Sequence, residues 1–340
     1  SLLLQAQKDL LESFVKVIAA AIDAKSPYTS GHCQRVPLLT EMLTRAAIVQ
    51  ADGPLAGFTM DEDGWHELHL ASWLHDCGKV VTPEHIIDKS TKLETIHDRI
   101  HGVKARFATL KCRAEAEFWR AVAEGGDRTA LQSALQARLD QLDDDRRFLE
   151  TINIGGEFMA AEKIDRLHKI ASERWIDAEG VDMPLLSDNE VDNLSVARGT
   201  LTQEERDIIN GHMAITIRML EQLPFPSNMR HVVEYAGGHH EKMDGTGYPK
   251  GLTRAQMSIP ARIMAIADIF EALTAVDRPY KKGKMLSETI NIMFRMKKAN
   301  HIDPDLFDIF LTSGVFRHYA ENHMNPNQID DVDISRYVGQ

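Results

Sequence analysis

The sequence predicts an all-α protein. Apolar residues recur at helical spacing through most of the chain, whereas alternating runs of Val, Ile and Thr between turns are nearly absent. With 340 residues, 43% of them apolar and 26% charged, the chain can bury one large core or two modest ones. We therefore expect a globular assembly of helices.

The first predicted helix covers residues 2–24. Its Leu3, Leu10 and Val17 recur every seven residues, with Phe14 beside them. Such a seam either continues an upstream coiled coil, through which a homodimer would form, or faces the core of its own chain. The pattern leaves both interpretations open.

Further helices follow from the same spacing. We predict them at residues 32–48, 62–77, 202–222, 228–237, 259–275, 286–298 and 304–322. They belong to two separated parts of one domain, residues 25–91 and 198–323, and a tail follows at 324–340.

The middle region, residues 92–197, is predicted to be an inserted helical hairpin or small bundle. Two segments have heptad seams, and a third helix is predicted at 157–176. The seams consist of Leu93, Ile96, Ile100, Val103, Phe107 and Leu110, and of Leu135, Leu142 and Leu149. This insertion is either a dimer interface or a rigid arm within one chain.

Charge and cysteine content exclude some classes of protein. A net charge of −12 argues against binding polymeric nucleic acid or an anionic membrane, although bound metals would still attract a small anion. Cys33, Cys77 and Cys112 form no CxxC pair, which favours a reducing, cytoplasmic compartment. The apolar run 14–22 is too short for a membrane span, and an upstream sensor or membrane segment is left open.

Three segments concentrate metal-binding residue types. HDCGK at 75–79 and HHEKMDGTGYP at 239–249 each follow an amphipathic stretch, where adjacent side chains can converge on one cation. Each motif alone also fits a surface turn with incidental histidines. Asp268 lies in the apolar run 263–270, where a carboxylate is costly to bury unless it binds a cation or is paired.

Together these segments resemble the HD-GYP family of metal-dependent phosphodiesterases. The matches follow the family order over about residues 20–120 and 198–320. They are YTSGH at 28–32 with Arg35, HDCGK at 75–79, LTQEE at 201–205 leading to His212, HHEKMDGTGYPKGL at 239–252, ARIMAIADIFEALTA at 261–275 and DRPYK at 277–281. The resemblance implies an HD-superfamily helical bundle interrupted by the insertion.

The resemblance also implies two divalent metal ions. One would be held by His32, His75, Asp76 and Asp268, and the other by Asp76, His212, His239 and His240, with Asp76 bridging. Imidazole and carboxylate ligands suit iron or manganese and leave zinc, nickel and cobalt open. Tyr28 stands where some family members use a Glu for a third metal, so we expect two.

Such a centre implies a hydrolytic mechanism. Two cations ~3.5 to 4 Å apart acidify a bridging water to hydroxide and polarise a phosphodiester. Asp76 and Lys79 would be catalytic, and Lys79 would also contact a phosphate. The substrate would further contact Arg278, Lys281, Gly247 and Tyr248.

The implied function is hydrolysis of a cyclic dinucleotide. The family's usual substrate is cyclic di-GMP, opened to pGpG and sometimes cut on to GMP, and some members prefer cyclic GMP-AMP. Two alternatives stay open: an HD phosphohydrolase for another nucleotide, and a catalytically silent, metal-bound sensor. The family's loop at 243–249 also implies a GGDEF-type partner.

Overall fold

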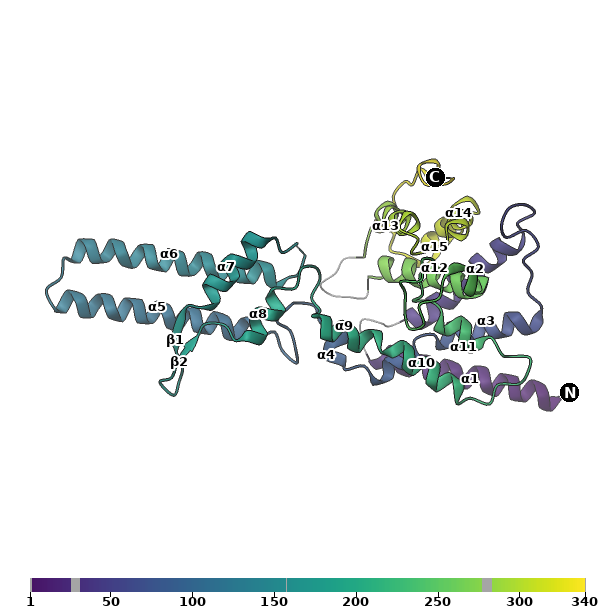
Figure 1. Cartoon of the computed structure of the whole chain (residues 1–340), viewed down its shortest axis with the longest axis horizontal. Helices are drawn as coiled ribbons and strands as arrows, with labels where there is room; N and C mark the ends of the chain where they lie inside the picture. The colour runs from purple at the N-terminus through teal and green to yellow at the C-terminus, as the bar shows by residue number, and fades with distance from the viewer. Residues whose placement is uncertain (1, 26–30, 157, 277–282, 340) are drawn as a thin grey trace. The chain divides into compact units, whose positions relative to one another are not determined.

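The computed structural model describes residues 2–25, 31–156, 158–276 and 283–339 (Figure 1). They divide into two compact units: Ser1–Glu84 with Ile208–Gln340, which we call the bundle unit, and His85–Asp207, the inserted unit. The predicted all-α class is confirmed, because the described residues form helices and a single two-stranded sheet.

The inserted unit begins before residue 92 and ends after residue 197. The reason is that the segments on either side of these positions contact each other. Lys89 Nζ lies 2.7 Å from Glu205 Oε2, and Thr200 Oγ1 donates to the carbonyl of Lys89. These contacts tie the segment that enters the insertion to the segment that leaves it. In the sequence, α4 (Glu84–Ile87) and α9 (Gln203–Asn210) span the two boundaries.

The bundle unit consists of helices packed around a central pair, α2 (His32–Ile48) and α12 (Ile259–Thr274). The other α-helices are α1 (Leu2–Lys25), α3 (Glu62–Leu74), α10 (His212–Glu221), α11 (Val232–Gly237), α13 (Leu286–Lys298), α14 (Pro304–Thr312) and α15 (Val315–His323). Short 3-10 helices are η1 (Cys77–Val81), η2 (Arg254–Gln256), η3 (Pro326–Gln328) and η4 (Ile334–Arg336).

Two hydrophobic cores lie on either side of the α2–α12 pair. One joins the pair to α13, α14 and α15, and the other joins it to α1, α3 and α11. Consecutive residues of α12 show the division, since Ile263 belongs to the first core and Met264 to the second. The polar faces of α2 and α12 therefore meet between two rigid apolar layers.

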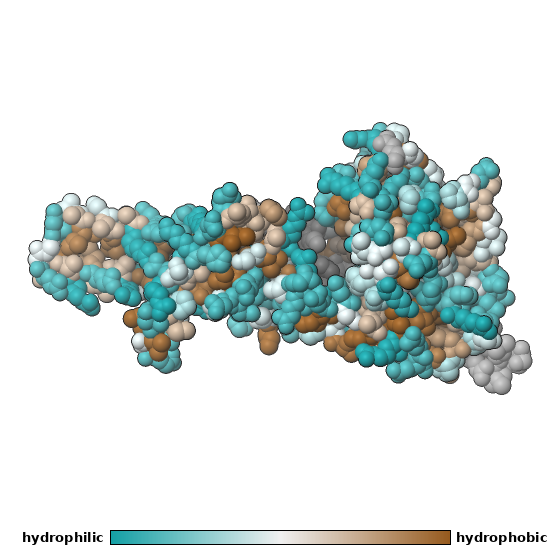
Figure 2. All heavy atoms as spheres, in the orientation of Figure 1, coloured by the Kyte–Doolittle hydropathy of each residue, from teal (hydrophilic) through white to brown (hydrophobic). Residues whose placement is uncertain are grey.

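The inserted unit is an antiparallel pair of long helices, α5 (Ile100–Ala123) and α6 (Arg128–Asn153), joined through Gly125 and Gly126 (Figure 1). Its core also takes residues from α7 (Ala161–Ala171) and α8 (Asp188–Leu194). An antiparallel hairpin of β1 (Arg174–Ile176) and β2 (Asp182–Pro184) carries the exposed apolar residues Ile176, Val181 and Met183. In Figure 2, brown marks apolar residues at the surface of the molecule.

Several predicted elements are wrong in detail. The helix predicted at 157–176 ends at Ala171 and gives way to β1, because the β1–β2 hairpin pairs Arg174 with Pro184. The prediction at 304–322 is two helices separated by Gly314, whose φ of 77° lies outside the helical region. Ile96 is 92% exposed and precedes α5, so the heptad seam begins in helix only at Ile100.

The first helix buries a different face from the predicted seam. Val15, Ala19 and Ile22 pack in the core, whereas Leu10 and Val17 are exposed. The core-facing interpretation therefore holds for α1 through another stripe, and pairing through the seam stays a prediction. No helix in the described part of the chain has both the length and the apolarity that crossing a bilayer requires.

Candidate metal centre

The seven predicted metal ligands all lie in the bundle unit. Most of them stand at helix ends, where a side chain can leave the helix surface and point across its end. His32 begins α2, His212 begins α10, the pair 75–76 follows α3, and the pair 239–240 follows α11. Asp268 is the exception, in the middle of α12.

The structure gathers these seven side chains into two adjoining groups that can hold a metal ion. Within each group, the candidate ligand atoms lie within 4.8 Å of one another. The first group is His32, His75 and Asp268, and the second is Asp76, His212, His239 and His240. Six of the seven are at most 9% exposed, and His240 is half-buried.

Asp76 connects the two groups through its two carboxylate oxygens. Its Oδ2 lies 3.4 Å from Nε2 of both His32 and His75. Its Oδ1 lies 3.2 Å from Nε2 of His212 and 3.9 Å from Nε2 of His239. One carboxylate thus faces both groups, which is the arrangement that a bridging ligand requires.

Unsatisfied polar atoms in the second group fit a bound cation. Asp76 Oδ1, His212 Nε2 and His239 Nε2 are buried, and none has a hydrogen-bond partner within the described residues. A buried polar atom without a partner is costly unless something else satisfies it. These three atoms point toward one place and belong to residue types that ligate divalent metals.

Electrostatics in the first group favours positive charge. Burial lowers the pKa of His75, but the charge of Asp76 and hydrogen bonds with Asp268 and Asp76 raise it more, to about 9. Burial raises the pKa of Asp268, but hydrogen bonds from His32 and His75 hold it well below its usual range. At neutral pH His75 therefore retains its proton, which a metal ion would displace on binding, whereas Asp268 is already a carboxylate.

The adjacent histidines of the second group are neutral. Burial, together with the neighbouring His240 and His75, holds the pKa of His239 well below its ordinary value. Burial likewise lowers the pKa of His240 to about 4. A neutral imidazole keeps a lone pair available, so both rings can act as ligands without first losing a proton.

Gly78 explains how His212 comes to face Asp76. Its N–H donates to Thr216 Oγ1 at 2.9 Å, which joins η1 to α10. A Cβ at Gly78 would lie 2.0 Å from the carbonyl oxygen of His212, so only glycine permits this approach. The HDCGK motif therefore includes the residue that brings the second group against the first.

The loop after His240 folds back on that histidine. The buried Glu241 carboxylate accepts the N–H groups of Lys250 and Leu252, at 2.7 and 2.8 Å. Tyr248 donates its N–H to the carbonyl of His240 at 3.2 Å, and its ring stacks on the imidazole with centroids 4.9 Å apart. At Gly247, a Cβ would lie 2.4 Å from the backbone nitrogen of Lys242. The loop thus has a fixed course beside the second group.

Lys79 reaches the edge of the centre, where its Nζ lies 2.5 Å from Asp76 Oδ2. Burial lowers the pKa of Lys79, but Asp76 and Asp268 raise it more, so the side chain stays cationic. It also remains 25% exposed, and an ammonium that solvent can reach is available to an incoming anion.

The last turn of α1 contacts two segments that carry metal-facing residues. Asp23 accepts the N–H of Gly31 at 3.0 Å and that of Cys33 at 3.4 Å, on either side of His32. Lys25 donates to the carbonyl of Lys79 at 3.2 Å and to that of Thr82 at 2.6 Å. The end of α1 is therefore bonded both to the start of α2 and to η1.

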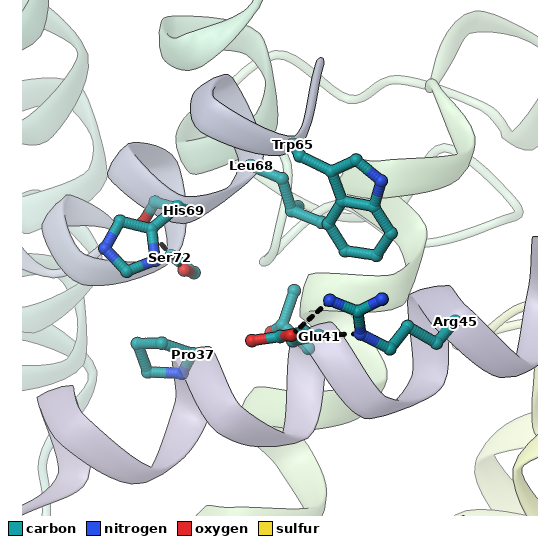
Figure 3. Close-up of a pocket in the computed structure, with 8 residues that line it drawn as sticks. Pro37, Glu41, Arg45, Trp65, Leu68, His69 and Ser72 are labelled. Carbon is teal, nitrogen blue, oxygen red and sulfur yellow. Dashed lines mark hydrogen bonds and ion pairs between the residues drawn. The ribbon is translucent and has the colours of Figure 1, made fainter. Parts of the chain in front are cut away.

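A cavity of about 200 Å³ lies between α2 and α3 (Figure 3). On its lining, Arg45 Nη2 lies 2.7 Å from Glu41 Oε1, and the guanidinium stands 4.7 Å over the Trp65 ring. The full lining is Pro37, Thr40, Glu41, Arg45, Trp65, Leu68, His69 and Ser72. None of the seven metal-facing residues lines this cavity, and we assign it no ligand.

Two predicted substrate residues, Arg278 and Lys281, lie outside the described residues, so their contacts stay predictions. Tyr28 lies outside them too, so the expectation of two metals rather than three also stays a prediction. Conversely, sequence reasoning missed Glu241 and Glu271. Both are 1% exposed; Glu271 contacts His32, and Glu241 accepts backbone N–H groups of the loop that follows His240. The signal for Glu271 was available, because it follows Asp268 by one helical turn in an otherwise apolar run.

Comparisons with known proteins agree with this geometry. The HD domain family matches residues 187–306. The chain is 40% identical over 113 residues to 3'3'-cGAMP-specific phosphodiesterase 1 of Vibrio cholerae, an alignment covering 33% of this chain and 25% of that protein. It is 41% identical over 114 residues to a cyclic di-GMP phosphodiesterase of Pseudomonas aeruginosa, covering 33% and 26%.

A longer alignment covers most of the chain. The chain is 26% identical over 298 residues to 3'3'-cGAMP-specific phosphodiesterase 3 of V. cholerae, covering 87% of this chain and 38% of that protein. The chain therefore spans well under half the length of these relatives. The HD-domain match, the relatives named as cyclic dinucleotide phosphodiesterases and the gathered histidines and aspartates all agree with the resemblance to the HD-GYP family.

Proposed function

We propose that the protein is a metal-dependent phosphodiesterase that hydrolyses a cyclic dinucleotide. The observation that carries this proposal is the position of Asp76, whose two oxygens face two separate groups of metal-binding side chains. When bound there, two divalent ions would supply an acidified water and an electrophile for the phosphodiester. Iron or manganese fits the mixed imidazole and carboxylate set.

The chain's own residues would position the substrate. Lys79 offers an ammonium beside Asp76 and would bind a phosphate oxygen, with three donors and no acceptor. Tyr248 and Gly247 lie on the fixed loop beside His240 and would form a wall of the substrate site. Phosphate binding by Arg278 and Lys281 belongs to the same proposal.

Cyclic di-GMP, opened to pGpG and possibly GMP as a second product, is the first substrate to test. Cyclic GMP-AMP is the second, because two of the relatives described above are named as phosphodiesterases specific for it. The homodimer, the GGDEF-type partner at loop 243–249 and the cytoplasmic location remain predictions from the sequence.

Metal analysis combined with turnover tests the proposal. The purified protein, loaded with Fe²⁺ under reducing conditions or with Mn²⁺, should hydrolyse at least one of the two cyclic dinucleotides. Asp76→Ala should reduce turnover by on the order of 10³ or more, since several kcal/mol of charge stabilisation would be lost. Glu67→Gln is the matched control, because Glu67 is also a buried carboxylate bonded to a histidine, His231, outside the two groups.

Two results would contradict the proposal. Tight binding of a cyclic dinucleotide without turnover under every metal tested would instead indicate a sensor. Undiminished turnover by Asp76→Ala would exclude a mechanism that depends on a bridging carboxylate.

A further inference from the structure

The metal-facing histidines differ in what supports their second ring nitrogen. His75, His212 and His239 each place Nδ1 against the backbone carbonyl three residues earlier, namely those of Ser72, Ile209 and Ala236. In each case the carbonyl fixes a tautomer with the proton on Nδ1 and turns Nε2 toward the centre. A neutral peptide oxygen is the acceptor in all three.

His32 is supported by a carboxylate instead. It is the first residue of α2, and its Nδ1 hydrogen-bonds Glu271 Oε2 on α12. The other oxygen of Glu271 accepts from Arg35 Nε at 2.6 Å. Glu271 is 1% exposed, so its charge acts on these two side chains with little screening by water.

The four residues form a repeated arrangement across the central helix pair. On α2, His32 faces the centre and Arg35 stands one turn later; on α12, Asp268 faces the centre and Glu271 stands one turn later. The two metal-facing residues thus occupy one layer, and the Arg35–Glu271 ion pair occupies the layer behind it. Within the described residues, the Glu271 carboxylate of this second layer contacts His32, which belongs to the first group.

A charged acceptor changes what an imidazole can do as a ligand. A carboxylate on Nδ1–H pulls the proton more strongly than a carbonyl does, which makes Nε2 a better donor to a cation. Outer-layer partners of this kind typically contribute ~10- to 100-fold in metal affinity. The contribution here falls on the first group alone, because the described histidines of the second group have carbonyl or ring contacts.

We propose that Glu271, anchored by Arg35, is a positioning residue that strengthens metal binding at the first group and so makes the two metal sites unequal. This inference rests on the metal centre of the proposed function but not on its substrate. It assigns the tighter site to His32, His75 and Asp268 with Asp76.

The proposal is tested by titrating the metal-free full chain with Mn²⁺ alone. Calorimetry and electron paramagnetic resonance monitor the titration. The wild type should bind two Mn²⁺ in two resolvable steps and give a spin-coupled spectrum. Glu271→Gln should weaken the tighter step by ~10- to 100-fold. At a Mn²⁺ concentration between the two dissociation constants of Glu271→Gln, the spectrum of this variant should be that of an isolated Mn²⁺.

Controls separate this role from a general effect on folding. Glu67→Gln removes the charge of a buried carboxylate that accepts the N–H of His231 at 2.7 Å, and it should leave both steps unchanged. The step that survives in Glu271→Gln is itself evidence of a folded centre. Should that variant not fold, Arg35→Met, which keeps the carboxylate and removes its anchor, must still weaken one step by several-fold.

The outcomes are distinct. The inference would be overturned if a folded Glu271→Gln kept both binding steps unchanged or weakened both equally. Where that variant does not fold, the same results for Arg35→Met would overturn it. A wild type that binds fewer than two Mn²⁺ would overturn it as well. Selective loss of one step in a protein that cleaves no cyclic dinucleotide would support the inference while the proposed function failed.

Discussion

Lys79 and Asp76 lie three residues apart and make a direct ion pair, yet they suit different tasks. A carboxylate offers lone pairs to a cation, whereas an ammonium offers only donors. Lys79 therefore fits the substrate side of the centre better than the metal side.

Lys79→Met tests whether Lys79 acts on the substrate and not as a metal ligand. We expect kcat to fall by on the order of 10² to 10⁴, the usual contribution of a group that moves a proton or holds a reacting phosphate. The metal content should stay at the wild-type value, because no lysine nitrogen is needed as a ligand. Metal analysis and steady-state kinetics on one preparation check both points, with the exposed Lys169→Met as control. Loss of metal together with turnover would contradict the assignment.

Lys92 gives a pH prediction away from the centre. It is fully buried in the inserted unit and donates to the carbonyls of Leu194 and Val196. Burial, with a smaller contribution from Lys163, lowers its pKa from 10.5 to about 8. Between these values the unfolded chain binds the proton and the folded chain releases it, so stability contributed by this group rises with pH.

The free energy of unfolding of the wild type, relative to Lys92→Met, should therefore increase from about pH 8 to pH 10.5 and stay flat below that window. Urea unfolding at several pH values measures the difference. Lys169→Met shows the effect of removing an exposed lysine from the same unit. A relative stability that falls over this window would show the sign to be wrong.

At the scale of elements, the turn after α3 decides whether the two groups meet. Gly78→Ala would place a methyl group 2.0 Å from the His212 carbonyl oxygen and 2.7 Å from the Thr216 nitrogen. Because both neighbours are backbone, α10 must shift, at a cost of about 1 to 3 kcal/mol or more. We expect weaker metal binding at the second group together with lower stability.

Gly102→Ala is the matched control for that substitution. Gly102 lies in α5, and an added Cβ meets nothing within 4 Å. Since alanine is the better helix former, this change should stabilise the protein by up to about 1 kcal/mol. Equilibrium unfolding and Mn²⁺ titration of both variants provide the comparison, and equal behaviour of the two would contradict the packing argument.

How much the sequence predicts differs between elements and site. Helical periodicity located most helices, but it could not see the breaks at Gly211 and Gly314, since a glycine inside an apolar pattern is compatible with a continuous helix. It missed β1, whose three residues depend on pairing with β2. Motif order identified the residues that the structure gathers, because ligand types at helix ends leave a local pattern.

Contacts between distant segments left no such pattern. Glu271 supports His32 across 239 positions; its place one turn after Asp268 marks it as a buried carboxylate, but the local sequence does not indicate that His32 is its partner. The sequence left the role of the α1 seam open for a related reason: a heptad of large residues and a stripe of Val15, Ala19 and Ile22 coexist on one helix. Which stripe is covered depends on the neighbours α2 and α3.

At the scale of the whole molecule, two units with separate cores should respond differently to metal. All seven metal-facing residues belong to the bundle unit, so a metal that binds only the folded centre stabilises that unit by mass action, by about 2.7 kcal/mol at 100 times its dissociation constant. Calorimetry should show that a chelator lowers one melting transition by roughly 5 to 10 °C and leaves the other in place.

Hydrogen exchange assigns the transitions to units. Amides of α10 and α12 should lose protection on chelation, whereas those of α5 and α6 should not. If chelation shifts both transitions equally, the units do not unfold separately, and if it shifts neither, the gathered side chains do not bind metal in solution.

The hydrogen bonds from the end of α1 to α2 and η1 have a mechanical consequence. Asp23 and Lys25 are two residues apart, so they project about 200° apart around the helix axis. Asp23 bonds the backbone on either side of His32, at the start of α2, and Lys25 bonds the backbone of η1, which carries Lys79. A rotation of α1 about its axis would therefore act at once on the backbone beside His32 and on the backbone of Lys79.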